Sequence, residues 1–251
     1  MVGCSSRKSK SDHPEEIFLR NYAIDLLTPV YIPRMLLGTQ IMKIGIVGAG
    51  NIGGTAAELF ANAGHEVVIS NSRGPQSIAS HVNSIGPTVT AKTVKDAVQF
   101  GEVILLAIPW RKRQELPSSE LFEGKIVIDA MNPYSENFEV LDLGNSTSSE
   151  EVSKQLHTSS LVKAFNTIYY EHLRTKGRRD APKEDRFAIF VAGDDPEAKA
   201  VVSRLIEDIG FAPVDSGSLR EGGRKQQPGS PIYNNPMILE VACKRLAELT
   251  S

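Results

Sequence analysis

Gly48, Gly50 and Gly53 follow an apolar stretch at residues 42–47 with the spacing Gly-x-Gly-x-x-Gly. The first glycine permits a tight turn, the second lets the backbone approach a pyrophosphate, and the third lets the following helix pack closely on the strand. Unpaired N–H groups at the start of that helix attract an anion. The pattern indicates a dinucleotide site, with a purely structural glycine turn as the alternative. The residues expected to contact the pyrophosphate are Gly48, Gly50, Asn51, Ile52 and Gly53.

A second cluster, Asn71-Ser72-Arg73, follows the next apolar run at residues 67–69. It lies about 20 residues beyond the glycine turn, where NAD-binding domains place an Asp or Glu on the ribose hydroxyls. The cluster contains no acid. A carboxylate would repel the 2′-phosphate of NADP, whereas a Ser hydroxyl and an Arg guanidinium can hydrogen-bond to it. We therefore expect Asn71, Ser72 and Arg73 to bind NADP(H); the alternative is an ordinary surface arginine.

Side chains at three further strand ends border the crevice in which open parallel sheets bind ligands. Trp110, the only tryptophan, follows the run 103–108 and is placed to wall the nicotinamide or its partner ring, or to be an ordinary half-buried tryptophan. Asn132 is placed to bond to the carboxamide or to a nearby loop. Asn166 and Thr167 are candidates for polar contacts near the position of hydride transfer.

The sequence offers no conventional acid–base or metal site. No Ser-His-Asp arrangement or paired carboxylate stands out, and neither of the two cysteines has ligands at a metal-binding spacing. Three of the five histidines are interpreted as surface residues: His65, His157 and His172. Hydride transfer between a nicotinamide and a flavin-like ring needs mainly alignment, because the cofactors carry the chemistry. We therefore expect an oxidoreductase without a metal.

The elements that must hold these residues alternate between strand and helix after Met42, which favours a mainly parallel sheet covered on both faces. The expected strands cover residues 42–47, 67–69, 88–90, 103–108, 126–128, 161–165 and 187–192. The expected helices cover residues 53–63, 94–100, 150–157, 196–209 and 236–249. The prediction is an α/β fold with a Rossmann-type, doubly wound sheet and a smaller C-terminal α/β region.

Composition shifts suggest three parts of the chain. Residues 1–41 lack a periodic apolar pattern and are expected to form a poorly ordered N-terminal extension. Residues 42–170 are expected to form the NADP-binding domain, and residues 171–251 a smaller region that completes the acceptor cleft. Within the latter, residues 171–186 are charged and predict a solvated loop, while residues 217–231 are rich in Gly, Gln and Pro and predict a mobile connection.

The chain has 28 basic and 30 acidic residues, so it lacks the excess of positive charge that binds nucleic acid or an anionic membrane. No stretch approaches the roughly 20 apolar residues that a spanning helix requires. We therefore expect a cytoplasmic protein whose partner is a small-molecule redox acceptor. A homodimer is compatible with the sequence.

Taken together, these motifs resemble the NADPH-dependent coenzyme F420 reductase family, also called F420-dependent NADP oxidoreductases. The resemblance covers nearly all of residues 42–219. It rests on the glycine turn and on the segments at residues 71–73, 108–110, 162–168, 192–195 and 215–219.

The resemblance implies roles for individual residues. It places the 2′-phosphate of NADP on Ser72 and Arg73, and a deazaflavin, where one is used, against the nicotinamide in a cleft beside the smaller C-terminal part. The residues that it places near the nicotinamide are Ile108, Pro109, Trp110, Thr167 and Ile168.

These motifs leave the chemical identity of the hydride acceptor open. Residues 165–169 read Phe-Asn-Thr-Ile-Tyr, where true deazaflavin reductases tend to have His-Thr-Ile-Pro, and residues 227–236 also resemble a broader set of bacterial NADP-binding reductases. A deazaflavin, a flavin or another small redox molecule is the expected acceptor. The alternatives are an imine or carbonyl reductase related to pyrroline carboxylate reductase and a redox-sensing module that binds NADPH without turnover.

Overall fold

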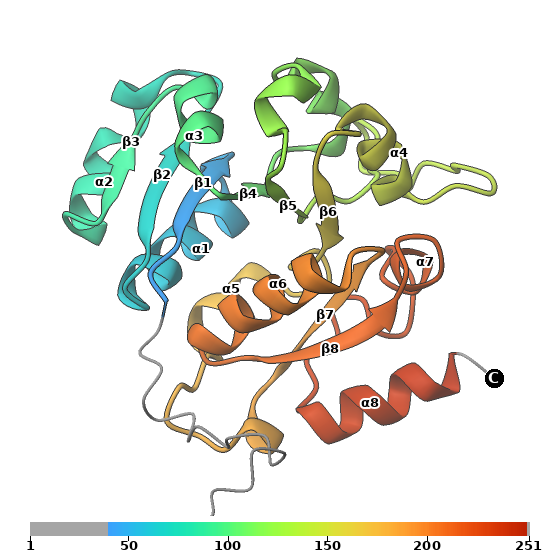
Figure 1. Ribbon diagram of the computed structural model, residues 1–251. Helices are drawn as coiled ribbons and strands as arrows, with labels where there is room; N and C mark the ends of the chain where they lie inside the picture. Colours follow the sequence, from blue (N-terminus) through green and yellow to red (C-terminus); the bar gives the residue numbers. More distant parts are fainter. Residues whose placement is uncertain (1–39, 250–251) are drawn as a thin grey trace, which may run out of the picture. The chain divides into compact units, whose positions relative to one another are not determined.

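A computed structural model describes residues 40–249, whose strands form one eight-stranded sheet in the order β3-β2-β1-β4-β5-β6-β7-β8 (Figure 1). The strands are β1 (Lys43–Val47), β2 (Glu66–Ser70), β3 (Val89–Ala91), β4 (Val103–Leu106), β5 (Ile126–Asp129), β6 (Ser160–Lys163), β7 (Ala188–Gly193) and β8 (Ala212–Gly217). The helices are α1 (Asn51–Asn62), α2 (Ala79–Ile85), α3 (Val94–Phe100), α4 (Ser148–Gln155), α5 (Tyr170–Thr175), α6 (Pro196–Asp208), α7 (Glu221–Lys225) and α8 (Leu239–Glu248). The prediction that residues 1–41 form a poorly ordered extension concerns mainly residues 1–39, which lie outside the described part of the chain.

The sheet confirms the predicted doubly wound, mainly parallel α/β architecture. All neighbouring strands run parallel except β6 and β7, which pair antiparallel. The strand order reverses between β1 and β4, and ligands of such sheets bind at this reversal, beyond the carboxyl ends of the strands. The division of the chain at residue 170 stays a prediction, since β7 and β8 continue the same sheet. Within residues 40–249 no helix has the length and apolar character needed to cross a bilayer.

Strand side chains alternate between two cores. Leu105 of β4 packs in a core with apolar residues of α1, α5 and α6, whereas its neighbours Ile104 and Leu106 pack on the other face with residues of α3 and α4. The central strands are therefore apolar on both faces, as in parallel sheets covered by helices. This burial explains why their sequences read as continuous apolar runs.

The last two strands are covered from both sides. Helix α6 begins as predicted at Pro196, where the Asp195 carboxylate accepts hydrogen bonds from the backbone amides of Glu197 and Ala198. Helix α8 packs on the opposite face of β7 and β8, against a small core that contains Phe190 and Val214 (Figure 1). Both helices hold this end of the sheet in place beside β6.

Two segments are more ordered than their composition predicts. Residues 171–186 do not form a continuous loop, because α5 occupies their start and anchors itself in the main core through the fully buried Leu173. Residues 217–231 contain α7, whose glycine-rich sequence packs against β8. A Cβ on Gly222 would lie 2.7 Å from the Ser216 hydroxyl oxygen, so the missing side chain is what allows the close approach.

His65 is fully buried, which corrects its interpretation as a surface residue. Its Nδ1 accepts a hydrogen bond of 3.2 Å from the backbone amide of Met42, and its Nε2 lies 3.5 Å from a carboxylate oxygen of Asp208. The ring also meets Phe60 edge-on. A residue just after a helix end is exposed only if nothing packs over it, and here Met42, directly before β1, and Asp208, at the end of α6, both contact the His65 ring. His157 is exposed as expected, whereas His172 is half-buried on α5.

We expect His65 to make the fold acid-sensitive. Burial lowers the pKa of His65 from 6.5, against the opposing effect of Asp208. The unfolded chain therefore takes up this proton more readily, so the stability from neutral His65 is present above its unfolded pKa and lost as the pH falls toward the lowered value. Urea unfolding at neutral pH and at about pH 5.5 should show a smaller loss of stability in His65→Gln than in the wild type.

The exposed His157 provides the matched control for this measurement. His157→Gln should lose stability with falling pH as the wild type does. An unchanged pH dependence in His65→Gln would contradict the assignment.

Candidate functional site

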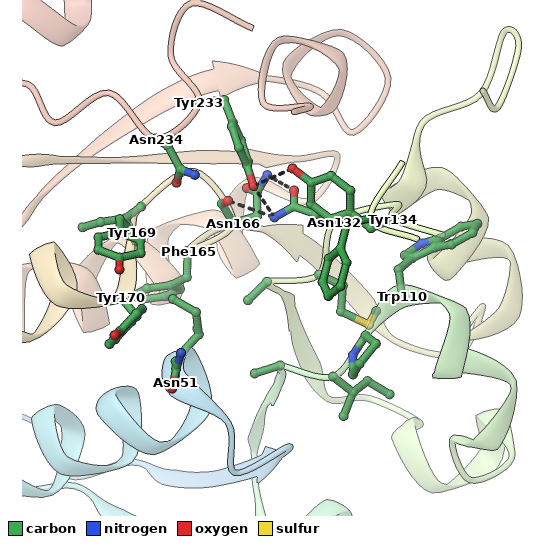
Figure 2. A pocket seen from close by; sticks show the side chains of 18 of the residues that line it. Asn51, Trp110, Asn132, Tyr134, Phe165, Asn166, Tyr169, Tyr170, Tyr233 and Asn234 are labelled. Carbon is green, nitrogen blue, oxygen red and sulfur yellow. Dashed lines mark hydrogen bonds between the residues drawn. The ribbon is translucent and has the colours of Figure 1, made fainter. Parts of the chain in front are cut away.

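Two cavities lie at the carboxyl ends of the parallel strands and meet at residues 107–109, just after β4. The first, called here the glycine-turn cavity, has a volume of about 530 Å³ and is lined by residues 47–50, 71–73, 94, 107–109, 112 and 115–116. The second, the tyrosine cavity, has a volume of about 620 Å³ (Figure 2). Its lining includes Asn51, Ile52, Ile108, Asn132, Tyr134, Phe138, Asn166, Ile168, Tyr169, Tyr170 and Tyr233.

The three glycines of the turn lack side chains for different reasons. Gly48 has φ +111°, and a Cβ there would lie 2.3 Å from the Ala107 carbonyl oxygen; a Cβ on Gly53 would lie 1.9 Å from the Gly48 carbonyl oxygen. These two positions are glycine because the protein itself leaves no room. A Cβ on Gly50 would meet nothing within 4 Å, so the protein itself leaves room there, as the close approach of a ligand to the backbone requires.

The start of α1 is open to the same ligand. No side chain caps the helix at Gly50, and its first turn contains no acidic residue. The N–H groups of the first turn and the positive end of the helix dipole therefore face the space beyond Gly50. This arrangement fits a pyrophosphate, as predicted for Gly48, Gly50, Asn51, Ile52 and Gly53.

Asn71, Ser72 and Arg73 lie together at the end of β2 and line the glycine-turn cavity. Ser72 and Arg73 are exposed, and among the described residues neither side chain has a hydrogen-bond partner. The amide of Asn71 donates to the Ser77 hydroxyl at 2.7 Å, while its buried Oδ1 has no partner. Lys112, which the sequence analysis did not single out, lines the same cavity, where its ammonium forms an ion pair with Glu115. The 2′-phosphate contact stays a prediction that this placement supports.

Ile108 and Pro109 form the boundary between the two cavities, but Trp110 turns into the core. Only 4% of Trp110 is exposed, and its Nε1 donates a hydrogen bond of 3.1 Å to the Ser148 carbonyl oxygen. The Arg113 guanidinium lies 3.5 Å from the ring centroid. Trp110 borders the tyrosine cavity, yet its ring points away from the polar residues there (Figure 2). The geometry favours packing, the alternative that the sequence left open.

Four polar side chains meet in the tyrosine cavity (Figure 2). The Asn132 amide nitrogen donates to the Asn166 carbonyl oxygen at 3.1 Å and to the Tyr233 hydroxyl at 3.3 Å. The Tyr134 hydroxyl donates to the Tyr233 hydroxyl at 3.2 Å. Asn132 and Tyr134 follow β5, Asn166 follows β6, and Tyr233 comes from the segment between α7 and α8. The contacts thus join the ends of β5 and β6 to the segment between α7 and α8.

The orientation of both amides is fixed by backbone carbonyls, which can only accept hydrogen bonds. The Asn166 Nδ2 donates to the Gln226 carbonyl oxygen at 2.8 Å and to Asn132 Oδ1 at 3.1 Å. Asn166 Oδ1 is buried and has no hydrogen-bond partner within residues 40–249. A buried acceptor without a partner is costly unless a ligand supplies the donor, so Asn166 is the better candidate for a carboxamide contact, and Asn132 serves chiefly to position it.

The other two residues predicted from the β6 strand end differ in placement. Ile168 is half-buried and lines the tyrosine cavity. Thr167 is 5% exposed and lies outside the lining of that cavity, and its carbonyl oxygen accepts a 2.9 Å hydrogen bond from the Asn234 amide. The predicted catalytic contact of Thr167 therefore has no support in the geometry, whereas its backbone helps to hold the segment that carries Tyr233.

A buried ion pair lies beneath the site. The Lys163 ammonium on β6 is 3.1 Å from the Asp129 carboxylate on β5, and both residues are at most 1% exposed. Lys163 also donates to the Met131 carbonyl oxygen, and Asp129 accepts from the Ser149 hydroxyl at 2.7 Å. Burial lowers the pKa of Lys163, while Asp129 opposes this shift. The pair fixes the backbone just before Asn132. Lys163 interrupts an otherwise apolar strand in the sequence, and a buried lysine of this kind requires an acidic partner such as Asp129.

The most important residues that the sequence analysis missed are Tyr134 and Tyr233. Tyr134 follows Asn132 closely, so its proximity to the site was readable from the strand end. Tyr233 lies just after the segment at residues 217–231 that was expected to be mobile, and nothing local indicates where its side chain points. Within residues 40–249 no group of His, Cys, Asp or Glu side chains is arranged to hold a metal ion.

Comparison with known proteins assigns the glycine turn and its neighbours to a described family. Residues 43–133 match the family described as NADP oxidoreductase, coenzyme F420-dependent. Protein SMa0349 from Sinorhizobium meliloti is 34% identical, with a TM-score of 0.70 over 79% of this chain and 96% of that one.

Two further relatives extend the comparison. A structure described as an F420-dependent NADP reductase from Arthrobacter sp. FB24 shares the fold, with 24% identity and a TM-score of 0.62 over 71% of this chain and 86% of that one. The chain is also 32% identical over 179 residues to metalloreductase STEAP3 of Rattus norvegicus, covering 70% of this chain and 34% of that protein. The chain thus spans about a third of the length of the metalloreductases that it matches.

Proposed function

Because the chain belongs to the family of coenzyme F420-dependent NADP oxidoreductases, we propose that it transfers a hydride between NADP(H) and a small planar acceptor. The acceptor is a deazaflavin, a flavin or another small redox molecule held in the tyrosine cavity. NADPH, when bound, supplies the hydride from its nicotinamide ring. The protein contributes binding, alignment and exclusion of water.

One observation carries this proposal: the two cavities meet at residues 107–109. The glycine-turn cavity offers a helix N-terminus and exposed Ser72 and Arg73 to the phosphates. A coenzyme that continues past Ile108 and Pro109 enters the tyrosine cavity with its nicotinamide. There Asn166, which lines the cavity, would hold the carboxamide and so help to align the nicotinamide with the acceptor.

The lining of the tyrosine cavity suits a planar acceptor. Its exposed and half-buried aromatic residues are Tyr134, Phe138, Tyr169, Tyr170 and Tyr233. Arg111 is the only charged residue among the described residues that line it. Aromatic faces stack on flat conjugated rings, and a single cation at the rim tolerates a neutral or singly anionic acceptor.

The test is oxidation of NADPH, followed by its absorbance, with 8-hydroxy-5-deazaflavin, flavin mononucleotide and 9,10-phenanthrenequinone offered in turn. The proposal expects turnover with at least one of them and competition between acceptors for the same site. Tight NADPH binding with no oxidation by any acceptor would favour the redox-sensing alternative. Turnover with cyclic imines alone would favour the imine reductase alternative.

A further inference from the structure

Tyr233 reaches the tyrosine cavity from a segment far away in the sequence. The segment between α7 and α8 is fixed by the fully buried Ile232 and by a 2.9 Å hydrogen bond from the Asn234 amide to the Thr167 carbonyl oxygen. Between these two anchors, the Tyr233 ring extends toward the ends of β5 and β6 (Figure 2). The contacts of the residues on either side of Tyr233 therefore fix the position of its hydroxyl in the cavity.

The hydrogen bonds around this hydroxyl leave its proton free. Among the described residues, the Tyr233 oxygen accepts from Asn132 Nδ2 and from the Tyr134 hydroxyl, and it donates to none. The Asn132 nitrogen cannot be exchanged for its oxygen, because it also donates to a backbone carbonyl. A hydroxyl that already accepts two hydrogen bonds directs its own proton elsewhere, and the remaining direction is the open cavity.

We propose that Tyr233 is the proton donor to the acceptor in the tyrosine cavity, and that Tyr134 resupplies this proton from solvent. The inference rests on the proposed function and narrows its substrate class. The acceptor must gain a hydride and a proton together, so it carries a carbonyl oxygen or a conjugated ring nitrogen that becomes basic on reduction. The acceptor gains two electrons, NADPH is oxidised to NADP⁺, and the Tyr233 O–H bond breaks as the new O–H or N–H bond forms.

The other phenols among the described residues that line the cavity are less suited to this role, because Tyr170 already donates its hydroxyl proton to Glu171 at 3.2 Å and Tyr169 is 43% exposed to solvent. The titratable or charged groups there are Tyr134, Tyr169, Tyr170, Tyr233 and Arg111, and none is a carboxylic acid or a histidine. Tyr134 contacts Tyr233 directly. Burial raises the pKa of Tyr233. The phenol therefore keeps its proton through the neutral range, as a donor must.

The test compares acceptors that need a proton with one that does not. Reduction of 9,10-phenanthrenequinone or 8-hydroxy-5-deazaflavin takes up a hydride and a proton. 10-Methylacridinium is also planar, but it is a cation and becomes neutral on taking up a hydride alone. In Tyr233→Phe, turnover with the first two should fall on the order of a hundredfold, whereas acridinium reduction should change by less than about threefold.

One measurement does not depend on turnover. NADPH affinity, followed by intrinsic fluorescence, should be the same in Tyr233→Phe and the wild type. Should Tyr233→Phe not fold, Tyr134→Phe removes the donor to Tyr233 and should slow the proton-requiring acceptors by about tenfold.

The outcomes separate the two proposals. Equal slowing with all three acceptors, or no slowing with the quinone and the deazaflavin, overturns the role of Tyr233 and leaves the hydride transfer intact. A wild-type protein that binds NADPH but reduces none of the acceptors overturns the proposed function and the Tyr233 role with it.

Discussion

Replacing Arg73 by alanine should weaken NADPH binding by about 10- to 100-fold, because the variant loses charge-assisted hydrogen bonds to the 2′-phosphate. NADH lacks that phosphate, so its affinity should be nearly unchanged. The expected result is therefore a loss of preference rather than a general loss of binding. Arg73 is exposed at the end of β2 and lines the glycine-turn cavity, so its removal should not disturb the fold.

Titration of both coenzymes by calorimetry measures this preference directly. Ser72→Ala should act in the same direction but more weakly, because a neutral hydroxyl contributes less than a guanidinium. Arg174→Ala is the matched control, since Arg174 is an exposed arginine on α5 that lines neither cavity. A wild-type protein that binds NADH as tightly as NADPH, or an unchanged ratio in Arg73→Ala, would contradict the phosphate contact.

Two alanine substitutions in the glycine turn should separate coenzyme binding from stability. In Gly50→Ala the new methyl group meets nothing of the protein, and the backbone at Gly50 is extended, with φ −82°. The free energy of unfolding should therefore change by less than about 1 kcal/mol. The methyl group occupies the path of the pyrophosphate, so NADPH affinity should fall at least about tenfold.

Gly53→Ala should behave in the opposite way. Its Cβ would lie 1.9 Å from the Gly48 carbonyl oxygen, a backbone atom that cannot move aside without shifting the turn. Overpacking of this kind typically costs about 1–3 kcal/mol of stability. Thermal unfolding and NADPH titration of both variants make the comparison. Equal effects of the two substitutions on stability, or an unchanged NADPH affinity in Gly50→Ala, would show that the turn has only a structural role.

Features that depend on neighbouring residues could be read from the sequence. The glycine turn, the start of α6 at Asp195 and Pro196, and the strands β1 to β6 all reflect local backbone demands or short apolar runs. The cluster at residues 71–73 could be placed because the distance from the glycine turn to the second strand end is set by one strand–helix–strand unit. The glycine turn, the cluster at residues 71–73 and the segment after β4 were predicted to border one crevice. All three line the glycine-turn cavity.

Features that depend on distant contacts could not be read in the same way. Trp110 follows a strand end and was therefore expected near a ligand. Its Nε1 instead donates to the Ser148 carbonyl oxygen, and its ring packs in the core on the α3 and α4 side of the sheet. His65 followed a helix end, yet β1 and α6 bury it. The segment at residues 217–231 looked mobile, yet its glycines let α7 pack closely on β8. In each of these places the deciding neighbour is remote in the chain, so no local pattern reveals it.

Local sequence patterns predict the proposed coenzyme site of this protein: a dinucleotide turn, a strand end suited to NADP and the parallel sheet that presents them. The proposed acceptor site, in contrast, depends on contacts between residues far apart in the chain. Tyr134 and Tyr233 are 99 positions apart, and their hydroxyls lie 3.2 Å from each other because β7 turns back along β6 and the chain then returns over the strand ends. The proposed phosphate site uses backbone geometry within one unit of the fold, whereas the tyrosine cavity is closed by side chains that follow β1, β5 and β6 and by Tyr233 from the segment between α7 and α8.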